Sequence, residues 1–257
     1  MPDILVSMQD NVAVVGLNRP EVRNAVTLNM WRELATLFIG LADDDRVRAV
    51  VLSGSGDDFS VGADISEFGK LRANKQQSVA YEEAVDACSA AIAGLAKPVI
   101  AAISGYCLGG GCHLALACDF RFANHSAKIG IPSAKLSIVY GVKSVQRLVA
   151  LAGIANAKRV LYSAERYDAA RSLAMGLIDE IHDDSLAGAV AYAQGLARNA
   201  PLSIAGAKFM LNGLSLGDGA LDIVAAERLV DQASDSEDFR EGRRAFAEKR
   251  APQFRGR

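Results

Sequence analysis

The feature that most constrains the fold is a short apolar run with a glycine triplet that begins after five intervening residues. Residues 99–103 read Val-Ile-Ala-Ala-Ile, which is typical of a strand buried on both faces of a sheet. Gly109, Gly110 and Gly111 follow, and an amphipathic helix is predicted to begin near Cys112. The first amides of such a helix lack internal partners and favour negative charge. This turn could therefore bind a phosphate or the oxyanion of an enolate.

The triplet alone leaves its purpose open, because tight packing of a strand against a helix would explain it as well. No Gly-Lys-Ser/Thr follows the glycines, which excludes a Walker phosphate loop. The spacing of the glycines also differs from that of the dinucleotide-binding fingerprint. Other parts of the sequence are needed to tell whether the glycines bind a ligand or only allow close packing.

Composition narrows the class of protein. The 257 residues carry a formal net charge of −2, which argues against a general nucleic-acid binder. No run approaches the roughly 18 apolar residues of a membrane span. The first residues contain neither a basic region nor a cleavage site, so a cytoplasmic protein is expected. The cysteines form no C-x-x-C pair and the histidines show no ligand spacing, so we expect buried thiols and no metal site.

The order of predicted elements is that of an α/β protein with a wholly helical end. Strands are predicted at 4–8, 12–17, 47–53, 99–103, 119–123 and 178–182, the first two joined as a hairpin. Helices are predicted at 28–41, capped by Thr27, then at 78–95, 186–199 and 201–214, and as a charged pair over 221–249. Residues 70–77 are polar and predict a mobile surface segment. From Ser144 onward helices are expected to break at Gly153, 163–168 and Gly176.

Two glycine-containing loops, each following a buried strand and opening a helix, are what an enzyme needs to hold one carbonyl oxygen between two N–H groups. Here the chain resembles the crotonase family, also called the enoyl-CoA hydratase/isomerase family. The matching segments follow the family's order and are 18–20 with 24–25, 59–65, 97–112, 118–119, 130–132, 146–148, 174–178 and 238–250.

This resemblance implies a spiral of ββα units over residues 1–195 and a helical C-terminal trimerisation region over 196–257. It also implies a homotrimer or a dimer of trimers. The ligand would be an acyl-CoA, with the CoA thioester as substrate and no separate cofactor. The run 236–257, with Phe239, Phe246 and Phe254, is expected either to pack on its own chain or to contact another subunit.

The resemblance also assigns a site. The backbone amides of Ala63 and Gly110 match the family's oxyanion hole, and removing one such donor typically costs about 3 kcal/mol of barrier. Arg23, Ala25 and Val61 match positions that cradle CoA, although Arg23 could equally be a solvated surface charge. The expected binding set is completed by Asp64, Ile65 and Gly109 beside the two oxyanion residues.

The departures from the family pattern concern proton transfer. Family hydratases carry glutamates at two positions that hold His113 and Ser133 here. Hydration needs one group to accept a proton and one to supply it, and a histidine with a pKa near 6.5 can do either. His113 could instead be a packed helix residue, Ser133 a simple cap, and Tyr140 either an acid or a pocket-lining residue. Asp64 and Glu67 rank below His113 as candidates.

Three functions follow as hypotheses. The first is an acyl-CoA enzyme, nominally a hydratase or isomerase, that uses the Ala63/Gly110 oxyanion hole and loses activity strongly in His113→Ala or Tyr140→Phe. The second is a non-catalytic acyl-CoA-binding protein that kept the scaffold without the carboxylates. The third is a decarboxylase or carbon–carbon lyase, whose family branch uses a tyrosine in the 138–141 loop but also a histidine where Ala63 stands.

Overall fold

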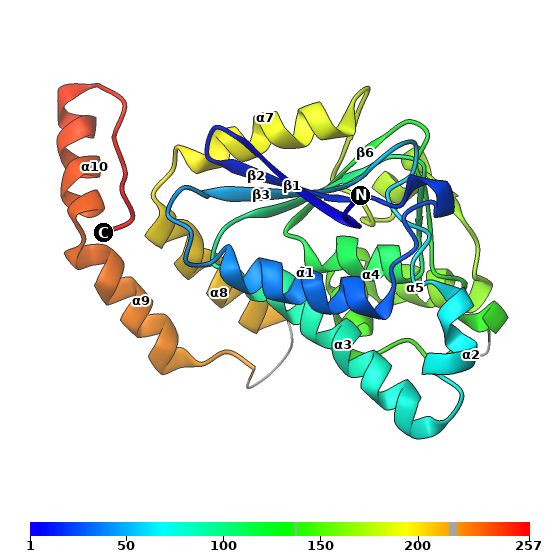
Figure 1. Ribbon diagram of the computed structural model, residues 1–257. Coiled ribbons are helices and arrows are strands. Elements are labelled where there is room, and N and C mark those ends of the chain that lie inside the picture. Colours follow the sequence, from blue (N-terminus) through cyan, green and yellow to red (C-terminus); the bar gives the residue numbers. More distant parts are fainter. Residues whose placement is uncertain (137, 216–219) are drawn as a thin grey trace.

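A computed structural model describes residues 1–136, 138–215 and 220–257 and contains a six-stranded main sheet in the order β1-β2-β3-β4-β6-β9 (Figure 1). Its strands are β1 (Ile4–Gln9), β2 (Val12–Leu17), β3 (Ala49–Gly54), β4 (Val99–Ile103), β6 (Phe120–Asn124) and β9 (Glu180–His182). The β1–β2 hairpin is antiparallel and every other pair is parallel. All six predicted strands are therefore confirmed, with ends displaced by at most a few residues.

Helices cover both faces of this sheet, which explains why its central strands are continuously apolar. Helix α7 (Ser185–Ala197) packs on one face, where Val51 and Ile100 meet Ala189. On the other face lie α1 (Leu28–Gly40) and α3 (Lys75–Gly94), and Figure 1 shows these two helices side by side below the strands.

A second, three-stranded sheet was not expected from the sequence. It consists of β5 (Tyr106–Leu108), β7 (Lys128–Gly130) and β8 (Tyr167–Asp168) in the order β5-β7-β8. Strands of this length contain too few residues to show a period of two. Because β5 follows β4 immediately and precedes a helix, the chain passes from the main sheet to the small one and then to α4. The glycine triplet lies at that second transition.

Two further corrections concern helix starts. Residues 70–77 do not form one surface segment, because α2 (Phe68–Leu71) ends there and α3 begins at Lys75. The Asn74 side chain accepts a hydrogen bond from the Gln77 N–H and caps α3, a signal that the polar composition concealed. The predicted Thr27 cap of α1 is confirmed by its bond from the Met30 N–H.

Helix α4 (Gly110–Ala117) begins two residues before the predicted position near Cys112 and is not amphipathic. Every residue from Gly111 to Ala117 is buried. The helix is enclosed because it packs against the helices α3 and α5 (Val142–Ser163) and against the strands β5 and β6, so no side of it faces solvent. Its early start makes Gly110 the first residue of the helix, so its N–H has no partner within α4.

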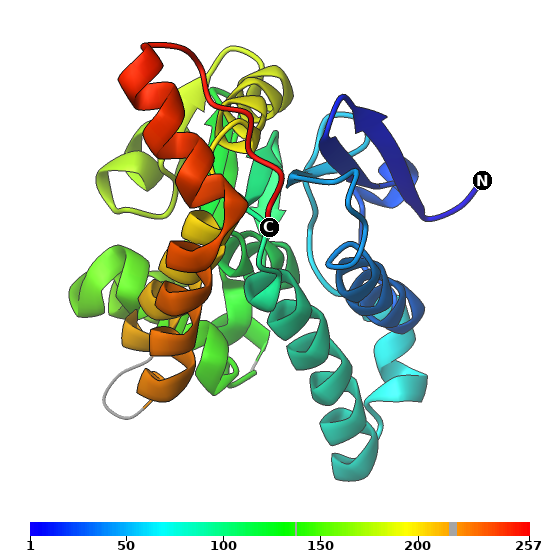
Figure 2. The same cartoon turned by 90° about the vertical axis from the view of Figure 1, so that its left-hand side faces the viewer.

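The C-terminal part is helical as predicted, and α5 is interrupted at Gly153, whose φ is +72°. The remaining helices are α6 (Ala169–Ala174), α8 (Pro201–Ser215), α9 (Ile223–Asp235) and α10 (Glu237–Glu248), with short 3-10 turns at Pro20–Val22, Ile65–Glu67 and Pro132–Leu136. Lys208 ties α8 to the core through a 2.7 Å ion pair with Asp119. Helices α9 and α10 lie at one end of the molecule, beyond α8 (Figures 1 and 2).

Among the described residues, no helix combines the length and apolar character needed to cross a membrane.

Candidate active site

The two glycine turns identified in the sequence meet in space. A methyl carbon placed on Gly110 would lie 3.0 Å from the Ala63 nitrogen, and one placed on Gly62 would lie 2.6 Å from the Gly110 nitrogen. Gly62 also has a φ of +91°, which L side chains rarely adopt. The backbones of the two turns are therefore in direct contact, and the contact depends on the missing side chains.

Both amides at this contact are free. Val26 pairs with the residues on either side of Ala63, donating to the Gly62 carbonyl at 2.8 Å and accepting from the Asp64 N–H at 2.9 Å. This pairing leaves the Ala63 N–H unused. Within the stretches that the structure describes, neither the Ala63 N–H nor the Gly110 N–H donates to a protein acceptor. Two neighbouring main-chain donors are thus without a protein acceptor at this contact.

Buried side chains hold the first turn. The Asn24 side chain accepts from the Arg19 N–H at 2.9 Å and donates to the carbonyls of Ser55 and Asp58. The Ser60 hydroxyl donates to the Asn24 carbonyl at 2.7 Å and accepts from the Gly62 N–H at 3.0 Å. Asn24 and Ser60 are fully buried, so this network fixes the turn before any ligand arrives.

Asp64 and Glu67 are committed to structure. Asp64 accepts from Ser66 and pairs with Arg19 at 2.9 Å, and these contacts, Ser66 first, hold the pKa of Asp64 below its usual value. Glu67 Oε2 accepts from the Leu28 N–H at 2.8 Å, at the start of α1. Both carboxylates thus hold local structure, Asp64 through Ser66 and Arg19 and Glu67 at the start of α1.

The second turn is held through Gly109. Its N–H donates to the Gly130 carbonyl at 2.9 Å, and its φ of +51° suits glycine. Its carbonyl accepts two bonds, one from the His113 N–H at 3.0 Å and one from the Tyr140 hydroxyl at 3.1 Å. Sequence reasoning placed Tyr140 near the substrate, whereas its hydroxyl proton is engaged by the protein. Burial raises the pKa of Tyr140 well above 10.

His113 lies on α4 with 5% of its surface exposed. Its Nδ1 hydrogen-bonds the Ser144 hydroxyl, and its buried Nε2 has no partner among the described residues. The rings of Trp31 and Tyr140 flank the imidazole edge-on. Burial, aided by the nearby Arg147 guanidinium, lowers the pKa of His113 to about 4. The imidazole is consequently neutral at pH 7, with Nδ1 held by Ser144 and Nε2 buried.

Ser144 is a site residue that the sequence analysis missed. It lies 31 residues after His113, on α5, and it is buried. No spacing rule links the two positions, because packing of α5 on α4 brings them together. Ser133 is also buried, on the turn Pro132–Leu136, where its carbonyl accepts from the Ile138 N–H. That contact is made by the backbone and does not involve the Ser133 hydroxyl.

The residues expected to cradle CoA lie within or next to the first turn and differ in exposure. The Arg23 side chain is 58% exposed, with Nε 3.7 Å from Asp58 Oδ2 and its guanidinium 4.9 Å from the centre of the Tyr106 ring. The backbone carbonyl of Arg23 accepts a hydrogen bond from the Val61 N–H at 3.1 Å, so the chain segments that contain these two expected positions lie side by side. Ala25 is buried, whereas Ile65 is 64% exposed.

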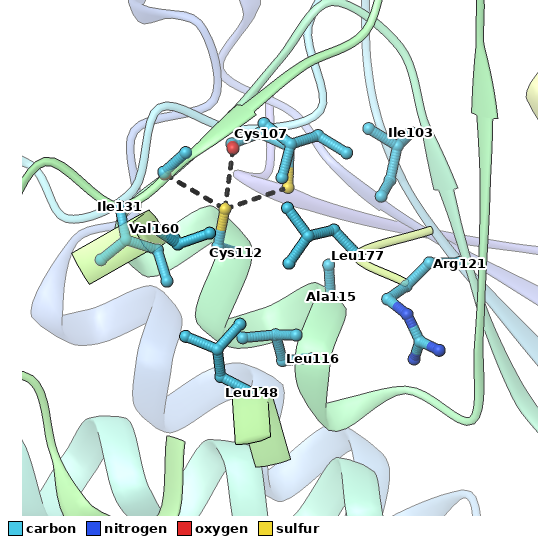
Figure 3. A pocket seen from close by; sticks show the side chains of 12 residues that line it. Ile103, Cys107, Cys112, Ala115, Leu116, Arg121, Ile131, Leu148, Val160 and Leu177 are labelled. Carbon is cyan, nitrogen blue, oxygen red and sulfur yellow. Dashed lines mark hydrogen bonds between the residues drawn. The ribbon is translucent and has the colours of Figure 1, made fainter. Parts of the chain in front are cut away.

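A separate small cavity lies behind α4 (Figure 3). Its volume of about 10 Å³ is close to the smallest that holds one water molecule, so it cannot take an acyl chain. Cys112 points into it, with its sulfur 3.8 Å from that of Cys107. All cysteines are buried free thiols, as expected. Among the described residues, no group of three His, Cys, Asp or Glu side chains could hold a metal ion.

The sequence profile of the enoyl-CoA hydratase/isomerase family matches residues 7–257. The chain belongs to this family. It is 32% identical to the 2,3-dehydroadipyl-CoA hydratase of Escherichia coli K12, with full coverage of both chains. Two crystal structures share its crotonase fold: an enoyl-CoA hydratase/carnithine racemase from Magnetospirillum magneticum (TM-score 0.90, 34% identity, 100% of this chain and 97% of that one) and an enoyl-CoA hydratase from Bacillus anthracis (TM-score 0.89, 31% identity, 100% of both). This family processes acyl-CoA thioesters, and the chain is an enzyme of the hydratase/isomerase type.

Proposed function

We propose that this enzyme binds an enoyl-CoA and stabilises its thioester enolate between the Ala63 and Gly110 N–H groups. The observation that carries the proposal is the contact between the two glycine turns, where both amides are free and adjacent. Fixed main-chain dipoles in a water-poor site stabilise developing negative charge without having to reorient. Arg23 and the backbone around Ala25 and Val61 would then hold the CoA moiety along the first turn.

The proton-transfer groups favour double-bond isomerisation over hydration. Hydration needs an acid and a base that act together, whereas one group can move a proton from one carbon of an enolate to another. His113 is neutral and its buried Nε2 has no partner among the described residues, while Asp64 and Glu67 hydrogen-bond Arg19 and Leu28. The family's second carboxylate position holds Ser133, which has no acidic character of its own. His113 is therefore the proposed proton carrier, with Ser144 holding its other nitrogen.

A panel of purified thioesters tests this proposal. We expect the enzyme to interconvert trans-2- and trans-3-enoyl-CoA. Chromatography of the CoA products measures this conversion. His113→Gln should abolish the conversion yet retain binding, because the backbone donors remain. Formation of 3-hydroxyacyl-CoA as the main product would show hydration instead. Release of carbon dioxide from a malonyl-type thioester would favour the decarboxylase or lyase alternative.

A non-catalytic acyl-CoA-binding protein is the second candidate. The observation in its favour is the absence of a free carboxylate at both family positions, which hold His113 and Ser133. It predicts saturable binding of every thioester in the panel, measured by calorimetry, without any product. Turnover that depends on His113 would rule it out.

We also propose assembly as a homotrimer or a dimer of trimers in the cytoplasm. The support for assembly is the position of α9 and α10 beyond α8 (Figures 1 and 2) together with the exposure of Phe239 (48%) and Phe246 (87%). The free thiols support a reducing compartment. Light scattering should give a multiple of the protomer mass, and Phe246→Glu should lower it. A monomeric wild-type protein would contradict the assembly.

A further inference from the structure

We propose that Tyr140 positions and polarises the peptide group between Gly109 and Gly110, and so tunes one of the two thioester donors. The inference rests on the proposed function, since it concerns the strength of the Gly110 N–H as a donor. It assigns Tyr140 a role different from the acidic one considered from the sequence. Tyr140 would act through the backbone and would not exchange a proton with the substrate.

The geometry follows from the peptide bond itself. The Gly109 carbonyl and the Gly110 N–H belong to the same peptide group, and the described residues contain no cis peptide bond. In a trans peptide the C=O and the N–H point in opposite directions. A hydrogen bond to this carbonyl therefore approaches from the side away from the ligand. It draws electron density toward the oxygen and makes the N–H a stronger donor, because linked hydrogen bonds polarise one another.

Two hydrogen bonds converge on that carbonyl. One comes from the His113 N–H at 3.0 Å and is the first bond of α4. The other comes from the Tyr140 hydroxyl at 3.1 Å, reaching back from the loop before α5. The second bond is not part of any regular element, so the helix would form without it. Its presence is what requires an explanation.

Orientation matters here because glycine flanks the peptide on both sides. Without Cβ atoms, Gly109 and Gly110 restrict the rotation of the intervening peptide plane only weakly. An effective donor must lie about 2.7–3.1 Å from the oxygen that gains charge, so a small rotation would waste it. The Gly109 N–H is anchored on Gly130, and Tyr140 fixes the plane from the carbonyl side.

The surroundings keep the tyrosine protonated. Burial raises the pKa of Tyr140 well above 10, and the ring packs edge-on against His113 with centroids 6.1 Å apart. The other titratable groups near enough for their charge to act on its hydroxyl are Cys107, Cys112 and Glu82. None of these supplies a positive charge that would favour the phenolate. The hydroxyl therefore stays a donor to the Gly109 carbonyl throughout the neutral pH range.

The test measures the ligand carbonyl directly. Wild-type enzyme, Tyr140→Phe and Tyr167→Phe are each mixed with butyryl-CoA labelled with ¹³C at the thioester carbonyl, which cannot isomerise. Infrared difference spectra then give the carbonyl stretching frequency of the bound ligand. We expect a shift to lower frequency in the wild type and a smaller shift in Tyr140→Phe. Tyr167→Phe, which removes the same atom from a buried tyrosine on β8, should keep the full shift.

Kinetics provide the second readout. Tyr140→Phe should lower kcat by about three- to tenfold, the value of one neutral hydrogen bond, with little change in KM and an unchanged pH profile. An undiminished infrared shift in Tyr140→Phe would overturn the inference. So would the loss of one limb of the pH profile, which would make Tyr140 a proton donor. If the wild-type enzyme binds the thioester without any shift, the two-amide site itself fails, and this inference fails with it.

Discussion

Replacing Gly110 by alanine places a methyl group at the contact between the two glycine turns. The methyl carbon would lie 3.0 Å from the Ala63 nitrogen and 3.1 Å from Cζ2 of Trp31. Ordinary van der Waals contact begins at 3.4 Å, so the turns must separate by about 0.4 Å. Effective oxyanion donors occupy a range of distances, about 2.7–3.1 Å, that is no wider than this displacement. One of the two N–H groups should therefore lose its bond to the enolate oxygen.

We expect kcat of Gly110→Ala to fall by about 10²–10³, because losing one oxyanion donor typically raises the barrier by ~3 kcal/mol. KM should change less, since charge on the thioester oxygen develops mainly in the transition state. The matched control is Gly94→Ala at the last residue of α3, where an added methyl meets nothing within 4 Å. Isomerase assays are read beside thermal unfolding of each variant. A folded Gly110→Ala enzyme with wild-type kcat would refute the reasoning.

Three further predictions concern stability. Because His113 has a pKa of about 4 when folded and 6.5 as its reference, the unfolded state binds more protons between these values. The free energy of unfolding should therefore fall by on the order of 3 kcal/mol from pH 7 to pH 4 in the wild type, and by less in His113→Gln. Urea unfolding at each pH measures this difference. An equal dependence on pH in both proteins would contradict the lowered pKa of His113. Asn24→Ala removes three hydrogen bonds and should cost about 3 kcal/mol, seen as a lower Tm, whereas an unchanged Tm would mean the turn holds itself. Lys208→Met leaves the Asp119 carboxylate without its cation and should lower the free energy of unfolding by about 3 kcal/mol. Adding Asp119→Asn to this variant should restore part of the loss. If the two substitutions have additive effects on stability, the pair is not coupled.

Local patterns were sufficient for the main sheet and for the two glycine turns. A continuous apolar run such as 99–103 has few options besides a strand covered on both faces, and Thr27 caps a helix by chemistry that one turn of chain contains. The structure also brings Gly62 and Gly110 into contact, as the family resemblance requires. These features depend on neighbours in the sequence or on a motif that spans only a few residues.

The features that escaped prediction depend on packing between distant segments. Ser144 meets His113 and Tyr140 meets Gly109 only because α5 folds back on α4, and each pair is separated by 31 residues. The pKa of His113 escaped for the same reason, since the residue type suggests titration near neutral pH but burial beside Arg147 lowers the value. The helical period of α4 was obscured because every side of that helix is covered.

The turns that hold the proposed oxyanion donors are separate from the side chains that would transfer protons, so the reaction could change while the fold stays the same. The proposed oxyanion donors are backbone groups, and the hydrogen bonds that hold their turns use the Gly130 carbonyl, the Val26 backbone, the Asn24 side chain and the backbone N–H of His113, but not the imidazole of His113 or the hydroxyl of Ser133. Under the proposed mechanism, exchanging the family's glutamates for His113 and Ser133 would therefore leave the stabilisation of an enolate in place. The number of groups that move protons would change from two to one. A site that keeps its dipoles and loses its second proton carrier should retain reactions that pass a single proton across an enolate, and it should lose those that must also activate water.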